Sequence, residues 1–124
     1  MDKYLKELQV KKKSVAFDRF VSQVSAAGDC PVRITNNIIG GKWKPVVFNL
    51  ILHDVNRFGE MLHLIEGLSK KVLTTQLREL ETDGIVTRTT FDERPLRVEY
   101  HLTDKGKSLT AVLDTMCMWG LNGA

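Results

Sequence analysis

The sequence predicts a mainly α-helical protein with one small antiparallel β-hairpin, and three observations lead to this fold class. In this chain of 124 residues, apolar residues recur at helical spacing over most of the part before Gly84. After Gly84 the period shortens to two, and β-branched and alternating residues predict a pair of strands. The helical period then returns from Thr103 to Gly120. We therefore expect several helices, a hairpin and one last helix.

The N-terminal region predicts two separate amphipathic segments. Its apolar residues form two stripes, Met1, Tyr4, Leu5 and Leu8, and then Phe17, Phe20, Val21 and Val24. The two stripes would point to different sides of one continuous helix, so we expect a break near residues 11–14. A second helix then covers about 15–26 and ends before Gly28.

Two helices come next, separated by a glycine pair. A short helix is expected at 32–39, and Gly40-Gly41 stops it. The following helix has Pro45 in its first turn, where the missing N–H costs nothing. Its apolar stripe comprises Trp43, Val46, Val47, Leu50 and Ile51. Trp43 is interpreted as a core residue because it lies on this stripe.

The centre of the chain predicts a helix-turn-helix. One helix runs from Phe58 to Ile65, a turn containing Gly67 follows, and Ser69 caps a second helix that reaches Asp83. The strands 85–91 and 97–102 make a hairpin with its tip at 92–95, which adds a wing. The prediction is a winged helix-turn-helix with flanking N- and C-terminal dimerisation helices. We assign an N-terminal extension to 1–29, the DNA-binding part to 30–102 and the dimerisation helix to 103–124, all within one compact domain.

The second helix of the helix-turn-helix has one apolar and one cationic face. On a helical wheel Leu73, Leu77 and Leu80 fall together, and the opposite side carries cations and hydroxyls. Such a face suits the major groove, because Lys and Arg pair with guanine edges or phosphates and Thr contacts thymine. The candidate DNA-binding residues of this helix are Ser69, Lys70, Lys71, Thr74, Thr75 and Arg78. An ordinary solvated helix surface is the alternative for this helix taken alone.

The wing contributes one further candidate for DNA contact. Arg94 stands at the expected hairpin tip, where an arginine can reach a phosphate or a narrow minor groove. The alternative is an exposed salt bridge with Asp92, Glu93 or Glu99. The same two interpretations stay open for Arg88 and Arg97 on the flanking strands.

Charge and motifs exclude several classes of protein. The net charge of +3 lies in residues 1–27, and residues 28–102 carry ten Lys or Arg against ten Asp or Glu. DNA binding must therefore come from charge placement on one face rather than from total charge. Catalytic, cofactor-binding and metal-binding constellations are not found in the sequence, and His53, His63 and His101 lack metal-ligand spacing. We expect no enzyme activity, no cofactor, no membrane association and a cytoplasmic location.

A family resemblance covers the segment from Cys30 to Gly120. The matching motifs include Cys30-Pro31-Val32, Ile39-Gly40-Gly41-Lys42-Trp43, Gly67-Leu68-Ser69, Asp83-Gly84-Ile85-Val86 and Val98-Glu99-Tyr100. In this order and spacing the segment resembles the HxlR-type winged helix-turn-helix transcriptional regulators, relatives of the MarR-like regulators. The resemblance implies a homodimer that binds double-stranded DNA at a near-palindromic operator and represses or activates nearby genes; it names no small-molecule effector. The alternative is a winged helix that serves as a protein-interaction module without DNA binding.

Cys30 stands just before the first helix of the resembling segment. The helix dipole and the nearby Arg33 favour a reactive thiolate there, whereas the adjacent Asp29 opposes it. The resemblance implies that a cysteine at this place can sense oxidants or electrophiles. Packing as a small apolar residue is the alternative, for Cys30 and for Cys117 alike.

Overall fold

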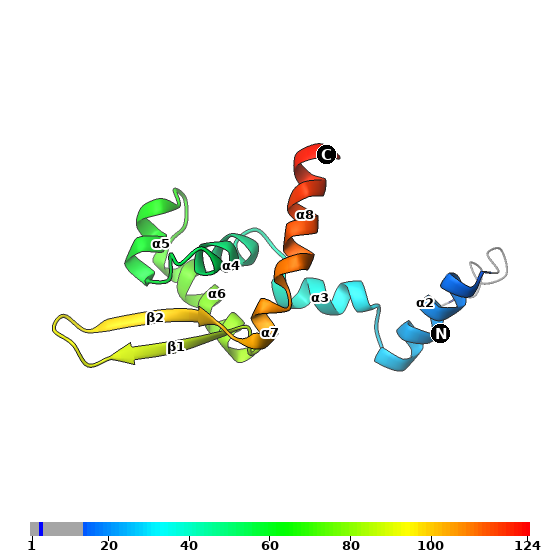
Figure 1. Cartoon of the computed structure of the whole chain (residues 1–124), viewed down its shortest axis with the longest axis horizontal. Coiled ribbons are helices and arrows are strands. Elements are labelled where there is room, and N and C mark those ends of the chain that lie inside the picture. The colour runs from blue at the N-terminus through cyan, green and yellow to red at the C-terminus, as the bar shows by residue number, and fades with distance from the viewer. Residues whose placement is uncertain (1–2, 4–13) are drawn as a thin grey trace. The chain divides into compact units, whose positions relative to one another are not determined.

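The computed structural model describes residue 3 and residues 14–124, and its contacts divide the chain into two units, residues 1–38 and 39–124 (Figure 1). Each unit is described by itself. The first predicted stripe, Met1 to Leu8, lies outside the described residues. None of the described helices is long and apolar enough to cross a membrane.

The first unit contains helix α2 (Val15–Ala27) and nearly all of helix α3 (Pro31–Ile39). Ser14 caps α2 by accepting a hydrogen bond from the Phe17 amide at 3.1 Å, which satisfies one of the free N–H groups of the first turn. Gly28 ends the helix in the left-handed conformation. Val21 is buried on the predicted stripe, and the Phe17 and Phe20 rings lie 6.5 Å apart. The second predicted stripe is therefore the packed side of α2.

Three helices form the core of the second unit: α4 (Lys44–Leu52), α5 (Phe58–Leu64) and α6 (Lys70–Thr82). Helix α6 packs against both α4 and α5. The fully buried side chains are Phe48, Ile39, Met61, Leu73, Leu77, Leu80, Ile85, Val47 and Val86. Trp43 is only half-buried, and the Lys42 ammonium lies 4.9 Å from its ring centroid.

The hairpin consists of β1 (Val86–Phe91) and β2 (Arg97–Leu102), paired antiparallel from Val86↔Leu102 to Phe91↔Arg97. It extends from the helical core as the predicted wing (Figure 1). The Tyr100 amide donates a 2.9 Å hydrogen bond to the Asn56 carbonyl, so the segment before α5 lies beside β2. The mainly α fold with one hairpin is confirmed.

The C-terminal region differs from the prediction of one helix over 103–120. It forms a short helix α7 (Asp104–Lys107) and a longer helix α8 (Thr110–Asn122). The Leu109 amide bonds the Gly106 carbonyl at 3.0 Å, three residues back, and the Ser108 hydroxyl donates to the Lys105 carbonyl. This tightened turn ends α7 before α8 begins.

The start of α7 is fastened to the end of α6 and the start of β1. The Thr103 hydroxyl donates to the Gly84 carbonyl at 2.5 Å and accepts from the Gly106 amide at 3.0 Å. Lys105 Nζ lies 2.8 Å from the Asp83 carbonyl oxygen. A Cβ on Gly106 would overlap the Ile85 carbonyl oxygen and would lie 3.3 Å from Ile85 Cγ2. Only glycine fits here without a backbone shift.

Candidate nucleic-acid interface

Helix α6 presents the predicted face to solvent because its apolar face is held in the core. Leu73, Leu77 and Leu80 are 0–2% exposed, which confirms the predicted apolar face of this helix. Its exposed side chains are the predicted Lys70, Lys71, Thr74, Thr75 and Arg78, together with Glu79, Glu81 and Thr82. The described structure thus brings these five predicted residues onto one outer surface.

The turn before α6 directs the helix N-terminus outward. Gly67 has φ +85°, a left-handed conformation that glycine adopts without strain. Ser69 then caps α6 as predicted, accepting from the Val72 amide at 3.1 Å. The remaining N–H groups of the first turn lack partners within the helix, as at any helix start, and could donate to a phosphate.

The two threonine hydroxyls bond to their own helix. Thr74 Oγ1 donates to the Lys70 carbonyl at 2.7 Å, and Thr75 Oγ1 donates to the Lys71 carbonyl at 3.0 Å. Each hydroxyl oxygen keeps its acceptor capacity, and each methyl group is free for apolar contact. In this rotamer threonine can accept from an adenine or cytosine amino group or contact a thymine methyl group.

A hollow of about 340 Å³ is lined by residues of α5, α6 and the hairpin. Its lining residues are Phe58, Thr74, Arg78, Glu81, Arg88 and Tyr100. Arg78 from α6 and Arg88 from β1 therefore line the same hollow, although they are ten residues apart in the chain. Both guanidinium groups are of the kind that binds phosphate, and the Glu81 carboxylate lines the same hollow. Sequence reasoning left Arg88 open, and the cross-element arrangement makes it a stronger candidate.

The two arginines at the end of the hairpin differ in their surroundings. Arg97 pairs with Glu99 at 2.7 Å and with Glu93 at 3.0 Å, and its guanidinium stacks on the Phe91 ring at 3.9 Å. Within the part of the chain that the structure describes, exposed Arg94 has no ion pair. Arg94 thus stays the wing candidate for DNA, whereas Arg97 makes the salt bridges foreseen as the alternative.

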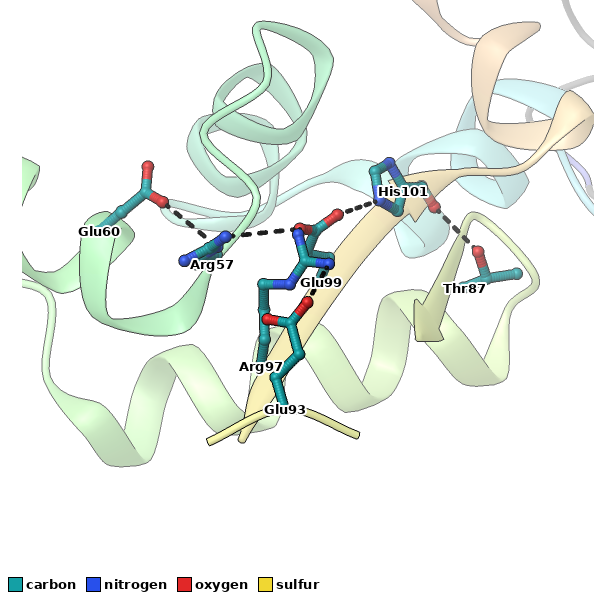
Figure 2. A network of polar contacts seen from close by, with 7 residues as sticks. All are labelled: Arg57, Glu60, Thr87, Glu93, Arg97, Glu99 and His101. Atoms are coloured by element: carbon teal, nitrogen blue, oxygen red, sulfur yellow. Dashed lines mark hydrogen bonds and ion pairs between the residues drawn. The ribbon is translucent and has the colours of Figure 1, made fainter. Parts of the chain in front are cut away.

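Glu99 is the centre of a polar network at the wing, shown in Figure 2. We call it the Glu99 network; its ionisable members are Arg57, Glu60, Glu93, Arg97, Glu99 and His101. The Glu99 side chain is 14% exposed, with His101 Nε2 at 3.0 Å from one oxygen and Arg57 Nη2 at 3.7 Å from the other. The hydrogen bond from His101 lowers the pKa of the Glu99 carboxyl, and Arg97 and Arg57 lower it further against the opposing effect of desolvation. Glu99 is thereby held as a carboxylate.

A second ion pair that sequence reasoning missed joins α4 to α6. Lys44 Nζ pairs with Glu79, and the Lys44 side chain is only 12% exposed. The sequence holds no local signal for this pair, because its two residues lie in different helices. The pair helps to place α6 against α4.

The two cysteines lie in different surroundings. Cys30 is half-buried, and its amide donates to Asp29 Oδ1 at 2.7 Å. That carboxylate also pairs with Arg33 at 3.4 Å. The cation expected to favour the Cys30 thiolate is therefore paired with Asp29, the residue expected to oppose it. Cys117 is exposed on α8. Among the described residues no three metal-ligating side chains come together.

Comparisons with known proteins agree on one family. The HxlR-like helix-turn-helix family model matches residues 38–123. The uncharacterized HTH-type transcriptional regulator YtcD of Bacillus subtilis is 43% identical over 91 residues, which cover 73% of this chain and 72% of that protein.

Solved structures agree with this assignment. The redox regulator HypR in its oxidized form has a TM-score of 0.70 and 41% identity, over 77% of this chain and 98% of HypR. The reduced form of the transcriptional regulator YodB from B. subtilis has a TM-score of 0.64 and 35% identity, over 73% of this chain and 89% of YodB.

Proposed function

Because this chain belongs to the HxlR-like helix-turn-helix family, we propose that it is a cytoplasmic, non-enzymatic transcriptional regulator that binds a near-palindromic DNA operator as a homodimer. Helix α6 enters the major groove, and the wing contacts the backbone or the minor groove. The observation that carries this proposal is the cationic and hydroxylated outer face of α6, next to a hollow lined by Arg78 and Arg88.

The same face argues against a protein-interaction module. Such a module needs an apolar or acidic surface on the outer side of α6, whereas Lys71, Thr75 and Arg78 are exposed there. A surface of this kind is typical of groups that bind phosphates and base edges.

The test is selection of bound sequences from random duplex DNA with the full-length protein. We expect enrichment of one motif with two related half-sites about one helical turn apart, or a multiple of it. Failure to enrich any sequence over several rounds at low salt would contradict the proposed function.

The homodimer proposal rests on helix α8. Val112, Met116 and Trp119 recur at helical spacing on one side and are 40–67% exposed, an apolar surface typical of an interface. Leu113 is 5% exposed and packs within the chain instead. The proposed partner surface in the second copy is the N-terminal segment around Phe17–Val24, where Phe17, Phe20 and Val24 are half-buried and Val21 is already buried within one copy.

We expect Trp119→Lys to convert the dimer into a monomer at micromolar concentration, because it places a charge on the proposed interface. Multi-angle light scattering measures the change. Asp114→Lys introduces the same side chain on the opposite side of α8 and should leave the dimer intact. A Trp119→Lys variant that stays dimeric would contradict the α8 interface.

We further propose that Cys30 is the oxidant-sensing thiol. Its place at the start of α3 and its partial exposure support this, as does similarity to HypR, a redox regulator. Mild oxidation should change the operator affinity of the wild type and of Cys117→Ser, but not that of Cys30→Ser. Titration of operator DNA before and after oxidation checks this. An unchanged oxidant response in Cys30→Ser would leave Cys30 as a packing residue.

A further inference from the structure

The Glu99 network joins the wing to the segment that precedes α5, the first helix of the helix-turn-helix. Arg57 belongs to the segment just before α5, in the helix-turn-helix, and it pairs with Glu99 and with Glu60 of α5. Arg97 and His101 belong to β2 of the wing and approach the same carboxylate (Figure 2). Glu99 therefore bridges cations from both elements.

This bridge matters because a two-stranded hairpin has little stability of its own. The described contacts attach the base of the wing to α4, α6 and α7. Further out, Glu99 accepts from Arg97, which in turn bonds Glu93 near the tip. The network thus extends from α5 to the residue next to Arg94.

We propose that Glu99 is a positioning residue for DNA binding: its carboxylate fixes the wing relative to the segment before α5, and α5 packs on α6, so that Arg94 and the α6 face reach the same duplex. The inference rests on the proposed function. Glu99 itself does not touch DNA in this proposal.

The sign of the expected effect separates positioning from plain electrostatics. A carboxylate near DNA repels phosphates, so its removal alone should strengthen binding. Loss of positioning should instead weaken binding, because the wing no longer holds its phosphate contact. One lost phosphate contact reduces the steepness of log K against log[salt] by about 0.9. At 0.15 M salt this corresponds to an affinity about fivefold weaker.

The experiment compares Glu99→Gln, Arg94→Ala and the double variant with the wild type on the selected operator, over a range of salt concentrations. Glu99→Gln should bind about fivefold more weakly at 0.15 M salt and show a salt slope lower by about 0.9. In Arg94→Ala, which already lacks the wing contact, Glu99→Gln should have little further effect. A merely structural role would not produce this coupling to Arg94.

The matched control is Glu66→Gln, which removes the same charge from an exposed carboxylate in the turn before α6. It should bind DNA as tightly as the wild type or more tightly. Circular dichroism verifies the fold of each variant. If Glu99→Gln does not fold, Glu99→Asp keeps the charge but shortens the side chain, and it should weaken binding in the same direction.

Wild-type affinity or tighter binding in Glu99→Gln, or effects of Glu99→Gln and Arg94→Ala that simply add, would overturn the positioning role. Each of these outcomes can be observed only when the wild-type protein binds its selected operator. Failure of the proposed function is a different result, in which the wild type selects no sequence.

Discussion

Replacing both Arg78 and Lys71 with alanine is expected to abolish operator-specific binding while the fold survives. Both side chains are exposed on the outer face of α6, so their removal disturbs no core packing. Loss of a bidentate base contact costs about 1–3 kcal/mol, and loss of a phosphate contact lowers the salt slope by about one. Fluorescence anisotropy with operator and scrambled DNA measures affinity and specificity together.

The control for this pair is Arg33→Ala combined with Lys107→Ala, which removes the same two residue types from other exposed helical positions. The control should keep operator specificity. Full operator affinity in the Arg78 and Lys71 double variant, with native circular dichroism, would contradict the assignment of α6 as the recognition helix.

Gly106→Ala is expected to cause the largest loss of stability among single methyl additions to glycine in the second unit. The new Cβ would overlap the Ile85 carbonyl oxygen and lie 3.2 Å from the carbonyl carbon, and backbone atoms cannot rotate away. Overpacking of this kind typically costs about 1–3 kcal/mol, and occasionally more. Urea unfolding at a fixed protein concentration measures the free energy, since an oligomer's stability depends on concentration.

Gly59→Ala is the matched control for this substitution. Gly59 also lies in a short helix, but a Cβ there meets no atom within 4 Å. Alanine should stabilise the helix by about 0.5–1 kcal/mol relative to glycine. Equal stability of the two variants would show that the contact at Gly106 relaxes freely.

Local patterns in the sequence were sufficient to predict most of the fold. The stripe of Leu73, Leu77 and Leu80 predicted the position of α6. The change in the period of apolar residues after Gly84 predicted the position of the hairpin. The break between α7 and α8 was missed because residues 104–108 carry no apolar side chain, so no stripe marks where one helix ends and the next begins. The break is made by the hydrogen bond from the Leu109 amide to the Gly106 carbonyl and by the one from the Ser108 hydroxyl to the Lys105 carbonyl.

The outer face of α6 was equally predictable, because side chains at helical spacing share a face. Of the Glu99 network, only the Arg97 salt bridges were anticipated, as the alternative to DNA contact. The alternation of β2 puts Arg97, Glu99 and His101 on one face, which was a usable signal for part of it. The Arg57 contact has no local signal, since Arg57 and Glu99 meet only when the segment before α5 lies beside β2.

The hydrogen bonds of Thr103 and Lys105 connect α7 directly to the end of α6. They attach it to the Asp83 and Gly84 carbonyls, where α6 ends, while α8 continues about 18 Å beyond it at 1.5 Å per residue. In the proposed dimer α8 acts as a lever arm, and a small tilt at its far end turns the end of α6. The separation of the two recognition helices can then be changed from the dimer interface, with no alteration of any residue that contacts DNA.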